Sequence, residues 1–178
     1  MFLNWRLEFS ISPKNLKLFK LYYMSFTQGI QTINSLTSDQ AVVSSVTPVD
    51  IGSTGTGNTI FSKVLPAGAR IRWELSGIFS LGATGGFRLL AHNTSAPTIY
   101  TAMFQVVDET TPATFQDAQV VEAAFTNASA VAGNYLLTAS GTVVANAATT
   151  FSLQFAQNNS TANPITMLKG MTITIWQF

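Results

Sequence analysis

The sequence contains no cysteine and only one histidine, His92. Without thiols the chain forms no disulfide and no thiolate metal site, and a single imidazole excludes a site built from several histidines. A Ser-His-Asp arrangement would have to use His92, which lies in the polar stretch HNTSAP. We therefore interpret His92 as a loop residue without a chemical role, and we expect no catalytic, metal or cofactor site.

Charged residues are scarce as well, at 10% of the chain against 47% hydrophobic residues. Asp108 and Glu109 are adjacent, so on a strand they would point to opposite faces, which does not suit a pair of catalytic carboxylates. Asp117 and Glu122 stand alone in the sequence. The glycine-rich stretches GSTGTGNT and LGATGGFR lack the Lys followed by Ser or Thr that a phosphate-binding loop needs. The sequence therefore predicts that the protein is not an enzyme.

The net charge of +1 argues against nucleic acid as a partner, but the charge is unevenly distributed. Residues 1–23 carry four basic residues and one acidic residue, a net charge of +3, whereas residues 24–178 carry five basic and seven acidic residues, a net charge of −2. The first segment lacks the basic start, apolar run and cleavage site of a secretory signal. It is also too short and too charged to span a bilayer. We treat residues 1–40 as an N-terminal arm.

Ser12 and Pro13 favour the start of a short helix in this arm. On such a helix the lysines share one face and the apolar residues share the other. Three interpretations stay open: a helix packed on its own domain, a leader outside the native chain with Met24 as a second start, and an anchor for a partner protein or a lipid surface. The residues expected to form the anchor are Lys14, Leu16, Lys17, Phe19, Lys20 and Tyr23.

From residue 41 onward, apolar and polar residues alternate with the period of two that is typical of half-buried strands. Turn-forming clusters rich in Gly, Pro, Asn, Ser and Thr separate the alternating runs, and nothing after Tyr23 predicts a long helix. Residues 41–178 are thus expected to form one all-β domain, an antiparallel sandwich, barrel or jelly roll. The expected strands are 70–80, 87–92, 98–107, 118–125, 134–144, 150–157 and 171–178.

Some of these strands are apolar on both faces, as in NYLLTASG and AQVVEAAF. In the last strand Met171, Ile173 and Ile175 suit the interior of a sandwich, which leaves Trp176 and Phe178 to be covered by something else. A second small, apolar face on a sheet is usually covered by another layer. We expect another subunit to provide this cover; the alternative is a loop of the same chain.

Residues 41–178 resemble the compact jelly-roll modules of bacteriophage structural proteins, which are similar to the tumour-necrosis-factor-like and complement-globular-head fold. The resemblance rests on a strand containing Gly141, the aromatic-x-Leu-Gln-aromatic-Ala-Gln strand from Phe151 to Gln157, an Asn/Ser/Thr-rich loop and a Lys169-Gly170 turn before the last strand. Upstream, FSKVLPAGARIRWELSGIFS resembles an early hairpin whose Pro-Ala-Gly turn precedes a long core strand.

The resemblance implies a homotrimer in which the last strand lies in a sheet packed around a threefold axis. The residues carried over to this interface are Tyr135, Gln154, Ala156, Trp176 and Phe178. The expected function is that of a structural virion protein, a capsid-attached spike, vertex or decoration protein that contacts other capsid proteins or a viral membrane surface through its arm. Two alternatives are a head that binds a host receptor or glycan, and a secreted cytokine-like or complement-like ligand.

Overall fold

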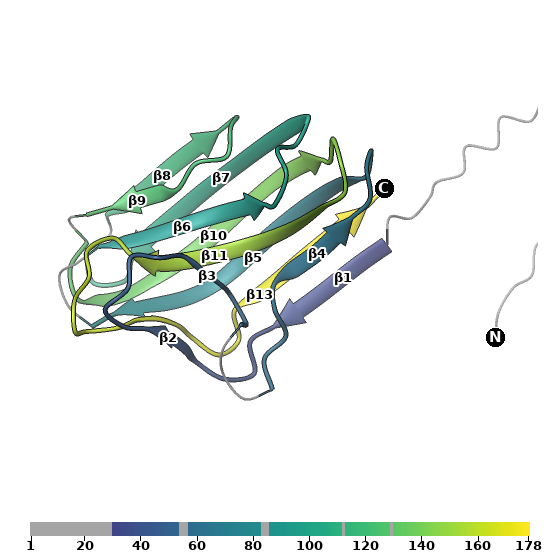
Figure 1. Ribbon diagram of the computed structural model, residues 1–178. Helices are drawn as coiled ribbons and strands as arrows, with labels where there is room; N and C mark the ends of the chain where they lie inside the picture. The colour runs from purple at the N-terminus through teal and green to yellow at the C-terminus, as the bar shows by residue number, and fades with distance from the viewer. Residues whose placement is uncertain (1–29, 54–56, 83–85, 112, 129) are drawn as a thin grey trace, which may run out of the picture.

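The computed structural model describes residues 30–53, 57–82, 86–111, 113–128 and 130–178. The expected anchor from Lys14 to Tyr23 therefore lies outside the described residues. Within the described ranges every regular element is a strand. These ranges contain no helix long and apolar enough to cross a membrane. The strands make two antiparallel sheets that pack face to face, which confirms the predicted all-β, jelly-roll-like sandwich (Figure 1).

The larger sheet has the strand order β1-β13-β5-β10-β7-β8, and β12 joins β5 to β2 at one side. Its strands are β1 (Ile30–Ser35), β2 (Gln40–Val42), β5 (Arg70–Leu81), β7 (Ile99–Asp108), β8 (Thr114–Gln119), β10 (Gly133–Val144), β12 (Ile165–Met167) and β13 (Thr172–Gln177). The smaller sheet has the order β3-β11-β6-β9, with β4 also paired to β11. Its strands are β3 (Val49–Asp50), β4 (Ser62–Leu65), β6 (Phe87–Asn93), β9 (Phe125–Asn127) and β11 (Thr149–Gln157).

The core between the sheets is built by the alternation seen in the sequence. Ile71, Trp73 and Leu75 of β5 are buried while the residues between them are exposed. The same pattern holds for the alternate residues of β6 and β7, and Met171, Ile173 and Ile175 fill the interior as expected. Burying these apolar side chains is the main stabilising contribution to the fold.

Aromatic side chains occupy the middle of this core. The Trp73 ring lies 6.2 Å from the Phe104 ring and 5.6 Å from the Phe151 ring, measured between centroids. Gly141 of β10 lies opposite Trp73 in the strand register. A Cβ atom at Gly141 would lie 2.8 Å from the Trp73 indole and 2.1 Å from the carbonyl oxygen of Thr101. The glycine therefore provides the space that the indole occupies.

The sandwich begins earlier in the chain than the sequence pattern indicated. β1 covers residues assigned to the arm, and it pairs along its whole length with β13, from Ile30 opposite Gln177 to Ser35 opposite Thr172. The sequence IQTINS does not alternate apolar and polar residues. None of the six residues is buried, because β1 is an edge strand at the open side of the sandwich. The edge of the last strand is thus covered by another strand of the same chain.

Two other segments differ from expectation. The expected strand 118–125 is interrupted: β8 ends at Gln119, β9 starts at Phe125, and the chain between them crosses from the larger to the smaller sheet. The turn at Pro66-Ala67-Gly68 does not close a hairpin, because β4 pairs with β11 while β5 belongs to the other sheet. In both places the chain changes sheets, and a period of two does not record such a change.

The turn after β7 is organised by Asp108. Its carboxylate accepts hydrogen bonds from the backbone N–H and hydroxyl of Thr110, at 2.8 and 2.7 Å, and from the backbone N–H and hydroxyl of Thr111, at 3.3 and 2.8 Å. These bonds, led by the Thr110 backbone N–H, lower the pKa of Asp108 from 3.8 to about 2. Asp108 is thus a structural residue of the turn, whereas its neighbour Glu109 is exposed.

The hydrogen bonds to Asp108 predict that the stability of the fold depends on pH in the acid range. Because the folded-state pKa of Asp108 is depressed, its carboxylate stabilises the fold above the unfolded-state pKa, and this contribution is lost as the pH falls from about 4 to about 2. Asp108→Asn is expected to lower the free energy of unfolding at pH 7, and the difference from the wild type should shrink toward pH 2. Urea unfolding at pH 7, 4 and 2 measures this difference.

The control is Glu109→Gln, which removes an exposed neighbouring charge and should change the free energy of unfolding by less than about 0.5 kcal/mol. A constant difference between Asp108→Asn and wild type across this pH range would contradict the assigned role of the carboxylate.

Candidate functional site

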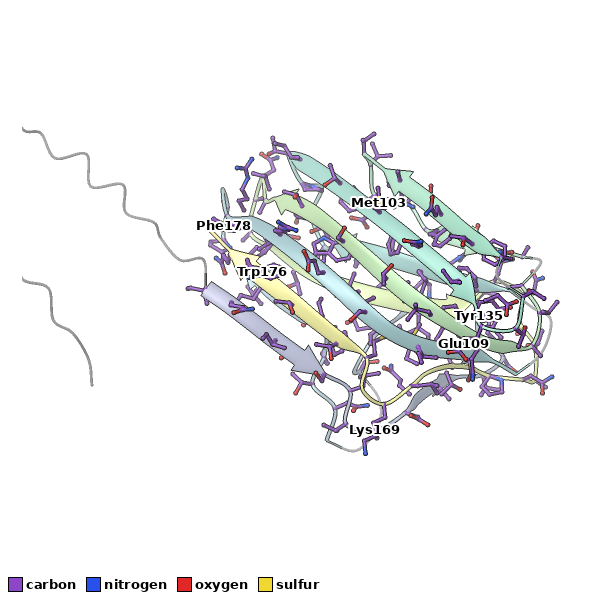
Figure 2. All side chains as sticks on the ribbon, turned by 180° about the vertical axis from the view of Figure 1, so that it is seen from behind. Met103, Glu109, Tyr135, Lys169, Trp176 and Phe178 are labelled. Atoms are coloured by element: carbon purple, nitrogen blue, oxygen red, sulfur yellow. The ribbon has the colours of Figure 1, made fainter. Side chains whose placement is uncertain are left out.

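The broadest candidate surface is the solvent-facing side of the larger sheet, which we call the outer face. It is formed by alternate residues of β13, β5, β10 and β7, which lie next to one another in the strand register. Figure 2 looks onto this side of the molecule, with Trp176 on β13 and Met103 on β7. The outer face consists of Thr172, Thr174, Trp176, Arg72, Glu74, Ser76, Thr138, Ser140, Thr142, Thr101, Met103 and Gln105.

This face is unusual for a solvated sheet because it carries little charge. The two charged residues in its middle neutralise each other: the Arg72 guanidinium donates to the Glu74 carboxylate at 2.6 Å. Arg70, exposed at the end of β5, lies on the same side at its margin. Such an exposed ion pair contributes at most about 1 kcal/mol to stability. The guanidinium also lies 5.7 Å from the centre of the Trp176 ring, at cation–π distance. The remaining side chains are hydroxyls, an amide and the exposed thioether of Met103.

The outer face is hollowed by two neighbouring depressions of about 400 Å³ each. Met103 and Ser140 line both of them, so the depressions adjoin near the middle of the face. Hydroxyl groups supply most of the polar atoms, and no side chain with an unpaired charge lines either depression. Because their lining carries no unpaired charge, these depressions suit contact with a neutral protein surface better than binding of an ionic ligand.

The structure separates the five residues predicted for the trimer interface. Trp176 lies half-buried on the outer face, and Phe178 follows at the end of the same strand with 60% of its surface exposed. Tyr135, in contrast, is buried in the core, where its ring stacks on Phe79 at 5.2 Å and its hydroxyl donates to the Val131 carbonyl at 2.9 Å. Tyr135 is therefore a core residue and is not accessible to another subunit.

Gln154 and Ala156 lie on β11, in the smaller sheet, and so on the opposite side of the sandwich from Trp176. The Gln154 amide donates to the Asp50 carboxylate at 2.8 Å, and Ala156 is fully buried within the single chain. The predicted residues thus do not form one surface. Alternation of residue types assigned each residue to an inner or outer side, but it carried no information about which sheet each strand joins.

A second candidate site lies near the end of β6, around Glu122. The Glu122 carboxylate pairs with His92 Nδ1 at 2.7 Å and accepts hydrogen bonds from the backbone N–H and the side-chain amide of Asn93, at 3.0 and 3.2 Å. His92 therefore lies on a strand and has a partner, which corrects its interpretation as an unpartnered loop residue. We call His92, Asn93 and Glu122 the Glu122 cluster.

A hydrogen-bonded chain continues beside this cluster. The buried Tyr100 hydroxyl lies 3.1 Å from the Ala91 carbonyl oxygen and 3.3 Å from Gln119 Oε1, so both acceptors share its single hydrogen. The Gln119 amide in turn donates to Asp117 at 2.7 Å. Burial, together with the negative charges of Glu122 and then Asp117, raises the pKa of Tyr100. Two carboxylates that appeared isolated in the sequence thus act on one buried hydroxyl.

Sequence reasoning missed the Glu122 cluster because its partners are far apart in the chain. Glu122 follows Asn93 by 29 residues, and the chain between them forms β7 and β8 of the other sheet. No local spacing signals such a contact. In the described ranges, no three His, Asp or Glu side chains gather closely enough to hold a metal ion.

No family model, no curated protein and no solved structure matches this chain.

Proposed function

We propose that this protein is a structural subunit of a bacteriophage particle and that three copies associate through the outer face of the larger sheet. The observation that carries this proposal is the lack of unpaired charge over the middle of that face, which faces away from the core across four strands; the exposed Arg70 lies at the end of β5, beside this region. A solvated sheet face normally carries charged residues, whereas an interface core is depleted in them. The resemblance of residues 41–178 to phage jelly-roll modules supports the trimeric state and the virion location.

In this proposal Trp176 and Met103 supply the large apolar contacts of the interface, and the Thr and Ser hydroxyls hydrogen-bond across it. Interface energy is typically concentrated in a few such residues, with tryptophan among the most frequent. The opposite charges of Arg72 and Glu74 cancel, so burial of this pair in the interface places no net charge there. The basic N-terminal arm attaches the trimer to other capsid proteins or to a viral membrane surface.

Met103→Asp is expected to convert the trimer to monomers. Each subunit would bring an unpaired carboxylate into the interface, and desolvating it without a partner is strongly unfavourable. Sedimentation velocity at micromolar concentration measures the oligomeric state, and circular dichroism checks that the variant is folded. Trp176→Asp should have the same effect.

The matched control is Val64→Asp, which places a carboxylate at an exposed position of β4 in the smaller sheet and should leave the trimer intact. A wild-type protein that sediments as a monomer or a dimer would rule out the proposed trimer. The proposed location is tested separately, by mass spectrometry of purified phage particles for peptides of this chain.

A further inference from the structure

A cavity of about 470 Å³ lies beside the Glu122 cluster, and Val120 lines both this cavity and one depression of the outer face. Two connections enclose it: the one that leads from β6 to β7 and the one that leads from β8 to β9. The first of these contains most of the polar stretch HNTSAP. The lining residues are Asn93, Ala96, Pro97, Thr98, Tyr100, Val120, Val121 and Glu122.

The charge around this cavity is negative. The Glu122 side chain is three-quarters buried, and its charge, like that of Asp117, acts on the buried Tyr100 hydroxyl. Among the described residues, the only basic group paired with Glu122 is His92, which contacts Oε1. Charges in such partly buried positions are weakly screened by solvent, so the site attracts a cation and repels an anion.

Asn93, one of the residues that line the cavity, has a buried hydrogen-bond acceptor that lacks a donor. Asn93 is only 5% exposed, and its amide nitrogen donates to Glu122 Oε2. Because a carboxylate accepts hydrogen bonds and does not donate them, this contact fixes the orientation of the amide. The other amide atom, Oδ1, is buried and accepts no hydrogen bond from any residue in the described ranges. Buried acceptors are normally satisfied, but a ligand in the cavity reaches this oxygen only if the residues that cover it move.

The rim of the cavity is aliphatic. Val120 and Val121 are 78% and 68% exposed, and they lie in the connection that interrupts the expected strand 118–125. Ala96 and Pro97 line the cavity from the other connection. Adjacent exposed valines are unfavourable in water unless something packs on them. An extended hydrocarbon stem is long and narrow enough to run along this rim toward Glu122.

We propose that this cavity binds the end of a lysine or arginine side chain from a partner protein. The ammonium or guanidinium group pairs with the Glu122 carboxylate, while the methylene stem packs against Val120 and Val121. A neutral ligand would gain nothing from the negative charge, and an anion would be repelled by it. The cationic ligand alone uses both the charge and the aliphatic rim. This inference does not depend on the trimer.

The test is an NMR titration of the isotopically labelled full chain with N-acetyl-lysine methylamide and N-acetyl-arginine methylamide. N-acetyl-norleucine methylamide is the matched neutral probe, because it keeps the aliphatic stem and lacks the charge. At least one cationic probe should shift the Asn93 side-chain amide and the backbone amides of 120–122, with a millimolar dissociation constant. The neutral probe should bind about tenfold more weakly or not at all, and added salt should weaken only the cationic probe.

Glu122→Gln removes the charge while keeping the shape of the side chain, and it should weaken the cationic probe by about tenfold. Glu109→Gln is the control, because Glu109 follows the opposite end of β7 from Thr98 and Tyr100; it should leave binding unchanged. Val121→Ser leaves the acidic residues intact and should weaken binding several-fold. If Glu122→Gln does not fold, the wild-type comparison of charged and neutral probes decides. Equal binding of these probes, or no shift at the cavity, would overturn the proposal.

Discussion

Trp73→Ala is expected to lower the free energy of unfolding by about 3–5 kcal/mol, the usual cost of truncating a fully buried tryptophan. Trp73 has no exposed surface and packs against the rings of Phe104 and Phe151. These neighbours come from β7 and β11, in different sheets, so the indole fills the space between the two layers. Removing it leaves a cavity that rigid strands on both sides cannot close.

The cost comes from packing, since the indole Nε1 of Trp73 has no hydrogen-bond partner among the described residues. Trp73→Phe should therefore cost less than Trp73→Ala. Trp176→Ala is the matched control: this tryptophan is half-buried on the outer face and contacts Arg72, so its removal should cost the monomer about 1 kcal/mol or less. Urea unfolding followed by circular dichroism, under conditions where the protein is monomeric, gives all three values. Similar losses for Trp73→Ala and Trp176→Ala would contradict the assigned core.

Gly141→Ala is expected to destabilise the fold by about 3 kcal/mol, at the upper end of the usual range for overpacking. The added methyl group would lie 2.1 Å from the Thr101 carbonyl oxygen and 2.8 Å from the Trp73 ring. A flexible side chain can move away from such a contact, but Thr101 belongs to β7, which is paired to β10 at this position. Relief therefore requires the two strands to separate, which breaks hydrogen bonds of the sheet.

Gly82→Ala is the control for this substitution, because its nearest contacts would be 3.1 Å from the side chains of Asn163 and Pro164. Its effect should be clearly smaller in thermal or urea unfolding. The loss for Gly141→Ala combined with Trp73→Phe should be smaller than the sum of the two single losses, since the smaller ring relieves the indole contact and leaves the carbonyl contact. Full stability of Gly141→Ala would show that β7 and β10 are farther apart than described.

The sandwich was predictable because alternation is a local property. Each of the long strands β5, β7 and β10 buries every second residue over most of its length, so its sequence records which side faces the core. β1 was missed because an edge strand buries little, and the break between β8 and β9 was missed because Val120 and Val121 look like strand residues. Their apolar character follows from their place on a cavity rim.

The candidate sites were much less predictable than the fold. Assigning Gln154 and Trp176 to one surface required knowing that β11 and β13 lie in different sheets, which depends on pairings across the whole chain. The contact between His92 and Glu122 likewise arises only when β6 and the connection after β8 meet. The expectation was correct for Trp176 and Phe178, which remain half-buried and exposed. The last strand alone indicates this, because it contains more large apolar residues than its inner side can bury.

The pairing of β1 with β13 has a consequence for the order in which the molecule forms. Ile30 lies opposite Gln177, so the first and last described strands are neighbours although nearly the whole described chain separates them. β13 also lies between β1 and β5, and β1 has no other strand partner among the described residues. On the ribosome, β1 therefore remains unpaired until β13 has emerged. Closing so long a loop is slow, and folding of the larger sheet is completed only after synthesis of this domain ends.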